Sequence, residues 1–240
     1  MRILLLGGTG EARALAERLH PDVDVISSLA GRVPDPALPV GEVRIGGFGG
    51  EDAMAAWLKE HRVDAVIDAT HPFAAAITDR AARVCGRLGL PHLVLERPAW
   101  DPGDALVATT VSEAADIVER QSFSRVFLTS GRSTVAAFRR SNAWFLVRLV
   151  TAADPAALPP RATVVLSRGP YRYDAELALL RQHRIDVLVT KNSGGQMTRA
   201  KLDAAAVAGV PVVMVARPAL PEGVARVSTV SEAADWLLAR

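Results

Sequence analysis

The fold is decided by residues 2–19, which read RILLLGGTGEARALAERL. Residues 2–6 are an apolar run of strand length, residues 7–10 form a glycine-rich turn, and residues 11–19 have the apolar spacing of an amphipathic helix. A strand, a glycine turn and a helix make the first unit of a nucleotide-binding sheet. Glycines let a diphosphate approach the backbone, and the helix N-terminus offers it N–H groups. We therefore expect a dinucleotide to be bound by Gly7, Gly8, Thr9, Gly10 and Glu11.

The glycine turn departs from the full G-x-G-x-x-G pattern. Thr9 stands at the middle glycine position and Arg13 at the last. A glycine loop by itself is weak evidence, and the alternative is a tight turn that merely connects a strand to a helix. Its position directly after an N-terminal apolar strand favours dinucleotide binding.

Length and composition limit the possible functions. With 240 residues, the chain is long enough for one large or two small domains. A single cysteine excludes an internal disulfide, and the five histidines show no ligand spacing, so we expect no metal site. No apolar run reaches the roughly 20 residues of a membrane span, and no basic stripe suggests nucleic acid. Because the N-terminus enters a strand rather than a signal peptide, we expect a cytoplasmic protein without membrane or nucleic-acid partners.

The positive charges are almost all arginine. The chain has 25 Arg and three Lys, at positions 59, 191 and 201. Codon bias explains such an excess, since the chain is also rich in alanine. A ligand that carries carboxylates or phosphates explains it equally well, because guanidinium groups pair with these anions in a two-pronged way.

Short apolar runs alternate with helical patterns along the whole chain. The predicted strands are residues 2–6, 23–27, 43–46, 64–68, 92–96, 125–129, 144–149, 163–167, 186–190 and 211–216. The predicted helices are residues 11–20, 50–60, 73–88, 112–119, 132–139, 173–183, 196–207 and 231–239. This alternation predicts an α/β architecture with parallel sheets.

The second half of the chain repeats parts of the first. Residues 110–116 and 229–235 both read TVSEAAD, and residues 89–99 resemble residues 209–219. We therefore predict two similar Rossmann-like halves, 1–120 and 121–240, with a cleft between them. The serine of each repeat, Ser112 or Ser231, is a candidate helix cap.

Polar residues at two strand ends of the first half suggest which dinucleotide is bound. Sites for NAD usually carry an acidic residue after the second strand, whereas sites for NADP offer hydroxyls and an arginine to the 2′-phosphate. Ser27, Ser28 and Arg32 fit the second case, so we predict that the 1–120 domain binds NADPH. Thr70 and His71 follow the strand at 64–68, which places them beside the cofactor. His71 is either a structural hydrogen-bonding residue or an acid–base group.

Three strand ends of the second half carry polar clusters that we expect to meet on one rim and to bind an anionic substrate. The residues are Ser130, Gly131 and Arg132; Arg168, Gly169 and Tyr171; and Lys191, Asn192 and Ser193. A cleft could hold the cofactor on one wall and this substrate on the other. The catalytic group is not determined by the sequence, and the candidate proton donors are His71, Tyr171 and Lys191.

Five stretches resemble the precorrin-6A reductase family, which includes the cobalt-precorrin-6A reductases. They are residues 7–11 (GGTGE), 68–74 (DATHPFA), 96–100 (ERPAW), 167–170 (SRGP) and 190–194 (TKNSG). The resemblance implies a cytoplasmic oxidoreductase of cobalamin biosynthesis that uses NADPH to reduce one double bond of precorrin-6A, giving precorrin-6B. A tetrapyrrole with many carboxylates would account for the arginine excess. The resemblance does not separate metal-free from cobalt-containing substrates.

Two other functions remain open from the residues. A sugar-nucleotide reductase also begins with a dinucleotide loop, but neither Tyr171 nor Tyr173 has a lysine four residues later. A non-catalytic dinucleotide-sensing module also begins with a strand, glycines and a helix, yet it does not need three polar strand ends in the second half.

Overall fold

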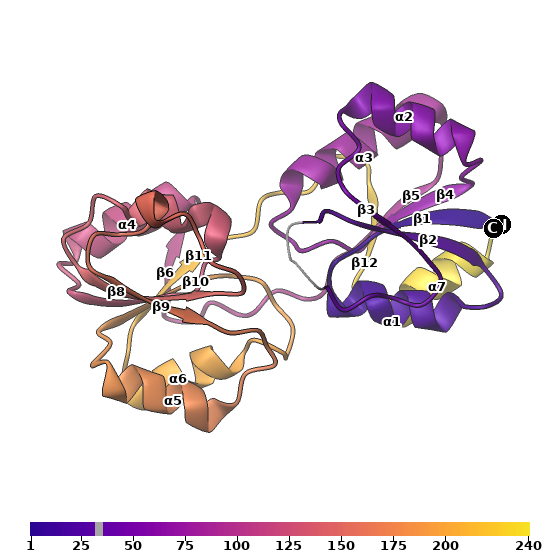
Figure 1. Cartoon of the computed structure of the whole chain (residues 1–240). Helices are drawn as coiled ribbons and strands as arrows, with labels where there is room; N and C mark the ends of the chain where they lie inside the picture. Colours follow the sequence, from indigo (N-terminus) through magenta and orange to yellow (C-terminus); the bar gives the residue numbers. More distant parts are fainter. Residues whose placement is uncertain (32–35) are drawn as a thin grey trace. The chain divides into compact units, whose positions relative to one another are not determined.

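The computed structural model describes residues 1–31 and 36–240 and divides the chain into two α/β units. Unit 1 contains Met1–Pro98 and Pro218–Arg240, and unit 2 contains Ala99–Arg217 (Figure 1). Each unit has one six-stranded sheet in which every strand pair is parallel. The predicted fold class, two similar Rossmann-like parallel-sheet halves, is confirmed.

Unit 1 has the sheet order β12-β5-β4-β1-β2-β3. Its strands are β1 (Arg2–Leu6), β2 (Asp24–Leu29), β3 (Glu42–Ile45), β4 (Ala65–Asp68), β5 (His92–Leu95) and β12 (Ala225–Val227). Its helices are α1 (Gly10–Leu19), α2 (Glu51–Glu60), α3 (Ala75–Leu88) and α7 (Val230–Leu238). The predicted dinucleotide loop therefore follows β1, a central strand between β4 and β2.

Unit 2 has the corresponding order β6-β11-β10-β7-β8-β9. Its strands are β6 (Leu106–Ala108), β7 (Arg125–Leu128), β8 (Trp144–Leu149), β9 (Ala162–Leu166), β10 (Val187–Lys191) and β11 (Val212–Val215). Its α-helices are α4 (Val111–Arg120), α5 (Tyr173–Gln182) and α6 (Ala200–Ala208), and its 3₁₀ helices are η1 (Arg132–Phe138) and η2 (Pro155–Ala157).

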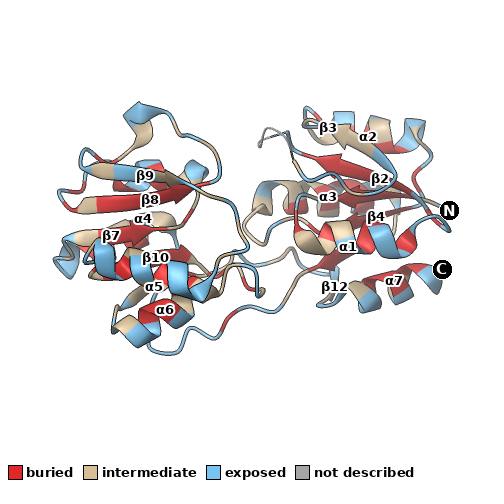
Figure 2. Cartoon of the chain, turned by 60° about the horizontal axis from the view of Figure 1, so that its bottom comes forward, coloured by how far each residue is buried: buried red, intermediate tan, exposed pale blue. Residues whose placement is uncertain are grey.

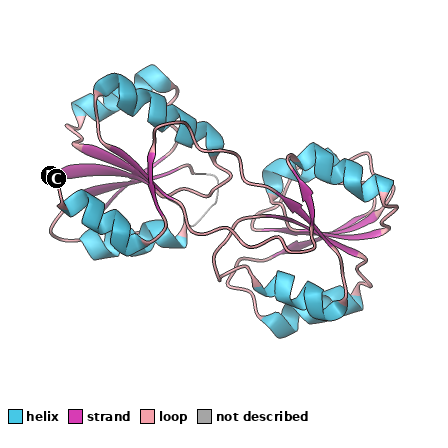
Figure 3. Cartoon of the chain, turned by 180° about the vertical axis from the view of Figure 1, so that it is seen from behind, coloured by secondary structure: helices cyan, strands magenta, loops and turns pink. Residues whose placement is uncertain are grey.

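Helices cover both faces of each sheet, and the central strands are buried (Figures 2 and 3). In unit 1, Ile3 and Leu5 pack with α1 and α7, whereas Leu4 and Leu6 pack with α2 and α3. Since successive side chains of a strand point to opposite faces, a strand buried on both sides must be apolar throughout. This requirement explains the unbroken apolar run at residues 3–6. Among the described residues, no helix is long and apolar enough to cross a membrane.

The two units exchange their last strand and helix. The pair β6 and α4 comes from the first half of the chain, but β6 joins the sheet of unit 2 beside β11. The pair β12 and α7 comes from the second half and joins unit 1, where β12 lies beside β5. The units therefore divide near residues 98 and 217, not at residue 120 as the repeat suggested. The repeat aligns similar sequences, but it does not tell which sheet each repeated segment joins.

Three local features differ from the sequence expectations. The short strands β6 and β12 were not predicted, and η1 is a 3₁₀ helix where the pattern indicated an ordinary helix. The TVSEAAD helices are capped by their threonines rather than by Ser112 or Ser231. The Thr110 Oγ1 accepts a hydrogen bond from the Glu113 N–H, and Thr229 forms a reciprocal capping box with Glu232. A cap must accept from an N–H two or three positions into the helix, and the serines lie too far inside it.

Candidate dinucleotide and substrate sites

The glycine loop after β1 is fastened to both neighbouring strands. The Gly7 N–H donates to the Ser28 carbonyl at 2.9 Å, at the end of β2. The Thr9 hydroxyl donates to the Ala69 carbonyl at 2.6 Å, just after β4, and accepts from the Ala12 N–H at 3.1 Å. Thr9, at the middle glycine position, thus serves as the cap of α1 and as a bridge to β4. The described residues predicted to bind the cofactor thus lie near the carboxyl ends of β1, β2 and β4, at one edge of this sheet.

The local shape of the loop fits a diphosphate. Gly8 has φ +106°, a backbone conformation that favours glycine, and a Cβ at this position would meet no neighbour within 4 Å. At Gly7 a Cβ would lie 3.4 Å from the Cβ of Ala12, so the strand and α1 approach closely there. The first N–H groups of α1 have no intrahelical acceptor and lie beside the open space at Gly8. This arrangement fits a bound dinucleotide.

The carboxylate of Glu11 is engaged within the protein. Its Oε2 lies 2.8 Å from Nη1 of Arg97, and both side chains are mostly buried. Arg97 follows β5, so the ion pair ties the start of α1 to the segment that leaves unit 1. Glu11, predicted to bind the cofactor, is held by Arg97, a residue of the ERPAW motif that was not assigned to a site.

An arginine of β3 lies beside the end of β2, and the sequence did not reveal it. Arg44 of β3 donates through Nη1 to the Ser28 Oγ at 2.8 Å and to the Gly46 carbonyl at 3.0 Å. Its Nη2 donates to the Gly47 carbonyl at 3.2 Å, and its guanidinium lies 3.9 Å from the centre of the Phe48 ring. Desolvation by burial lowers the pKa of Arg44. A guanidinium has five N–H donors, and these bonds use three of them within the described part of the chain.

The two remaining predictions at this strand end have different outcomes. Ser27 is buried, and its hydroxyl has no hydrogen-bond partner in the described part of the chain. Arg32 lies outside the described residues. Arg44 could have been suspected from its place in the strand that follows the serines, but only the sheet register brings it opposite Ser28.

The loop after β4 is organised by Asp68. Its carboxylate accepts from the Thr70 N–H and Oγ1 at 2.9 and 2.6 Å, and from the Thr78 Oγ1 of α3 at 2.6 Å. The next residue, His71, is exposed, and its Nδ1 accepts from the Phe73 N–H at 3.2 Å. A neutral imidazole that accepts at Nδ1 carries its proton on Nε2, and His71 lies at the carboxyl edge of the sheet.

The loop after β7 is not a second phosphate loop. Gly131 has φ +89° with open space around it, like Gly8. Ser130 is buried and accepts from the Thr134 hydroxyl at 2.9 Å through both Oγ and its carbonyl oxygen. Arg132 is exposed and begins η1. Because η1 is a short 3₁₀ helix, this loop has no α-helical N-terminus for a phosphate, in contrast to the loop after β1.

The loops after β9 and β10 lie against each other. The Tyr171 N–H donates to the Met197 carbonyl at 3.1 Å, and the Tyr171 hydroxyl donates to the Ser167 carbonyl at 3.1 Å. At Gly169 a Cβ would lie 3.4 Å from the Met197 carbonyl oxygen. Arg168 is exposed beside these contacts. The structure thus places the second predicted cluster against Met197, which follows the third cluster along the chain; that the three clusters meet on one rim stays a prediction.

The residues at the end of β10 have different environments. Burial lowers the pKa of Lys191, which makes its ammonium a stronger acid than an exposed lysine. Ser193 is half-buried and its N–H donates to the Lys191 carbonyl at 2.8 Å. Asn192 is buried, and its amide clamps the backbone of Trp100: Oδ1 accepts from the N–H and Nδ2 donates to the carbonyl. The predicted substrate residue Asn192 therefore fastens the segment that enters unit 2.

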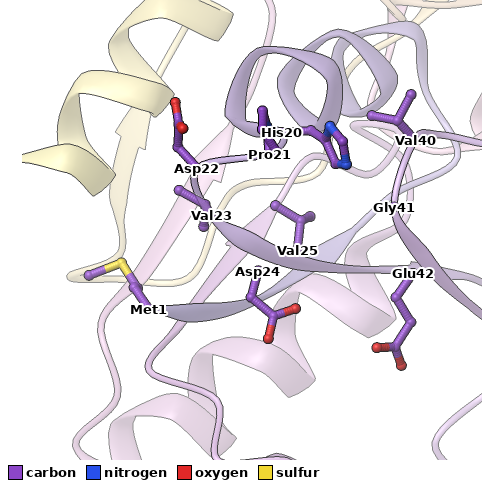
Figure 4. Close-up of a pocket in the computed structure, with 10 residues that line it drawn as sticks. All are labelled: Met1, His20, Pro21, Asp22, Val23, Asp24, Val25, Val40, Gly41 and Glu42. Atoms are coloured by element: carbon purple, nitrogen blue, oxygen red, sulfur yellow. The ribbon is translucent and has the colours of Figure 1, made fainter.

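A cavity lies at the other end of unit 1. It has a volume of about 440 Å³ and is lined by residues around the amino ends of β1, β2 and β3, including Met1, Asp24 and Glu42 (Figure 4). In parallel α/β sheets, ligands gather beyond the carboxyl ends of the strands. The glycine loop, not this cavity, is therefore the candidate site.

The fold and the loop after β1 define an α/β protein with two Rossmann-like units. Residues 2–238 match the family described as "Precorrin-6x reductase CbiJ/CobK", and the chain belongs to this family.

Individual relatives agree with the family assignment. The chain is 66% identical to a precorrin-6A reductase of Mycobacterium tuberculosis, over 98% of this chain and 97% of the relative. It is 29% identical to a cobalt-precorrin-6A reductase of Priestia megaterium, over 92% of each. A solved structure described as CobK precorrin-6A reductase superposes with a TM-score of 0.91 at 36% identity, over 100% of this chain and 96% of that chain.

Proposed function

We propose that this chain reduces one double bond of precorrin-6A in cobalamin biosynthesis, with NADPH as the reductant. The observation that carries the proposal is the open glycine loop at the N-terminus of α1, in a chain that belongs to the precorrin-6x reductase family. Residues 7–11 would hold the diphosphate. When bound there, NADPH supplies the hydride that a reduction of this kind needs. The cytoplasmic location stays a prediction.

The end of β2 supports NADPH over NADH. Residues 27–31 contain no acidic side chain that would repel a 2′-phosphate. Arg44 adds a positioned guanidinium beside Ser28, and the described residues use three of its five N–H donors. We assign the 2′-phosphate to Ser28 and Arg44, with the predicted Arg32 contact as a further donor.

The cationic loops of unit 2 suit a polycarboxylate tetrapyrrole. Arg168 is exposed on the loop after β9, Lys191 lies at the end of β10, and Arg132 is exposed after β7. A guanidinium or ammonium group pairs with a carboxylate by charge-assisted hydrogen bonds. Identity of 66% to a precorrin-6A reductase, against 29% to a cobalt-precorrin-6A reductase, favours the metal-free substrate.

Reduction of a double bond also needs a proton at the adjacent carbon. Tyr171 is a poor donor because its hydroxyl proton is directed to the Ser167 carbonyl. His71 accepts at Nδ1, which places the proton of a neutral ring on Nε2, and Lys191 is an ammonium whose pKa is lowered by burial. We propose that one of these two residues delivers the proton.

The direct test is anaerobic mixing of the chain with NADPH and precorrin-6A, followed by the absorbance of NADPH. Oxidation that requires the macrocycle supports the proposal, and its absence contradicts it. Cobalt-precorrin-6A in a parallel experiment tests the substrate assignment, which fails if the cobalt form is reduced more efficiently. Tight NADPH binding without any binding of either macrocycle would favour the sensing module.

Replacement of Arg44 tests the 2′-phosphate assignment. In Arg44→Met, we expect the KM for NADPH to rise about tenfold or more, because a charge-assisted contact with the phosphate is lost, while the KM for NADH changes less than about twofold. Arg83→Met is the matched control, since Arg83 is an exposed arginine of α3 that pairs with Glu51. An equal rise for both dinucleotides would contradict the assignment.

A further inference from the structure

Three ionisable side chains are buried together in unit 2, below the loops that carry the predicted substrate residues. They are Arg148 of β8, Glu176 of α5 and Lys201 of α6, which are 6%, 2% and 4% exposed. None of them belongs to the candidate site described above. Their contacts connect them to both loops.

Arg148 supports the loop after β9. Its Nη1 donates to Glu176 Oε1 in a fully buried ion pair, and its guanidinium lies 3.7 Å from the centre of the Tyr171 ring. Tyr171 in turn binds the Ser167 and Met197 carbonyls. The orientation of Arg148 therefore determines where this tyrosine, and the loop around it, can lie.

Lys201 supports the loop after β10. Its Nζ donates to the Thr198 carbonyl at 2.6 Å and lies 4.7 Å from the centre of the Trp100 ring. The indole N–H of Trp100 donates to the Gly195 carbonyl at 2.9 Å, and the Trp100 backbone is clamped by Asn192. Carbonyl groups at both ends of the 195–198 segment are thus held by Lys201 and its aromatic neighbour.

This arrangement is costly for stability. Arg148 pairs with one oxygen of the Glu176 carboxylate, and the second oxygen, Oε2, has no hydrogen-bond partner in the described part of the chain. Removing charges from water costs several kcal/mol per ion, and apolar residues of similar volume are often as stable or more stable. A lysine at position 201 is therefore not explained by packing alone. A function in shaping the loops explains it.

We propose that Lys201 and Arg148 are positioning residues for the substrate, and that their buried side chains hold the loops after β9 and β10 in the form that binds a carboxylate-rich macrocycle. The proposal rests on the proposed function, because it takes its ligand from there. Neither residue needs to touch the substrate. Arg148 acts through Tyr171, and Lys201 acts through the Thr198 carbonyl.

Steady-state kinetics of Lys201→Met test the proposal. The KM for precorrin-6A should rise about tenfold or more, because the loop loses its anchor, while the kcat and the KM for NADPH stay within about twofold. Lys201→Arg keeps the charge and should recover most of the affinity. Lys59→Met, at an exposed lysine of α2 in unit 1, is the matched control and should match the wild type. Hydrogen exchange should become faster in residues 195–199 of Lys201→Met.

A second variant covers the case that Lys201→Met does not fold. The double variant Arg148→Met/Glu176→Leu removes both members of the ion pair, so that neither is left buried without the other, and it should raise the KM for precorrin-6A in the same way. Unchanged KM values for precorrin-6A, or equal rises for precorrin-6A and NADPH, would overturn the proposal. If the wild type does not reduce precorrin-6A, the proposed function fails instead. Hydrogen exchange in residues 195–199 still measures whether Lys201 positions the loop, so the two failures are distinguishable.

Discussion

Thr9→Val removes a hydroxyl that makes two contacts and leaves the shape of the side chain nearly unchanged. The Ala12 N–H loses its cap at 3.1 Å, and the Ala69 carbonyl loses its donor at 2.6 Å. Loss of a helix cap costs about 1 kcal/mol, and an unpaired buried carbonyl costs about 1 kcal/mol more. We therefore expect the free energy of unfolding to fall by about 2 kcal/mol. For a chain of this size, that is a decrease of about 4–8 °C in Tm.

Thermal unfolding followed by circular dichroism measures this change, and fluorescence titration measures the Kd for NADPH. The glycine loop loses its bridge to β4 in Thr9→Val, so we expect NADPH to bind about threefold to tenfold more weakly. Thr9→Ser is the control, because serine keeps both hydrogen bonds and loses a single methyl group. If Thr9→Val and Thr9→Ser had the same Tm and the same Kd, the bridging function of the Thr9 hydroxyl would be refuted.

Two further predictions concern buried charges. Asp68→Asn replaces a carboxylate that accepts three hydrogen bonds, so it should lower the free energy of unfolding by about 2 kcal/mol. It should also reduce the kcat by displacing His71. Thr78→Val removes one of the three bonds and should lower the free energy of unfolding by about half as much. Chemical denaturation and steady-state kinetics measure both effects, and a kcat unchanged in Asp68→Asn would contradict the link to His71. Desolvation by burial, with a smaller effect of Arg148 and an opposing effect of Glu176, lowers the pKa of Lys201 from 10.5 to about 7. Between pH 7 and pH 10.5, Lys201 is protonated in the unfolded chain but largely deprotonated in the folded protein. The free energy of unfolding should therefore rise with pH, by about 3 kcal/mol from pH 7 to 9.5. Denaturation at several pH values should show this rise in the wild type but not in Lys201→Met, and equal slopes would contradict it.

The parts of the fold that the sequence predicted are those with strong local patterns. The strand at residues 2–6 is buried on both faces, so its apolar run is unbroken, and the glycine turn follows it directly. The short strands β6 and β12 have no such pattern. In β6, Leu106 and Val107 are 37% and 49% exposed, and the strand is formed by pairing with β11, about 100 residues further along the chain. Such strands depend on tertiary contacts that no local window contains.

In the candidate site, too, local patterns were predicted and contacts between distant segments were missed. Residues after β1, β2 and β4 were predicted because parallel sheets place ligands at their carboxyl edge. Arg44 was missed because it reaches Ser28 from the neighbouring strand. Asn192 was predicted as a substrate residue from its place in a polar cluster, but its amide holds the Trp100 backbone, a contact across more than 90 residues of sequence. A motif marks a position at the site, and only the contacts tell whether its side chain faces inward or toward a ligand.

The exchange of strands explains why the repeat misplaced the domain boundary. Each TVSEAAD helix follows a short strand that pairs with β5 or β11, and these two strands lie in the related segments 89–99 and 209–219. The repeated sequence therefore does not tell which sheet each strand and helix joins. The chain passes from one unit to the other within the Arg-Pro-Ala sequences at 97–99 and 217–219, where Arg97 binds Glu11 and Arg217 donates to the Asn192 carbonyl at 2.8 Å. A fragment that ends at residue 120 would contain β6 and α4 without their sheet, so each unit needs both halves of the chain.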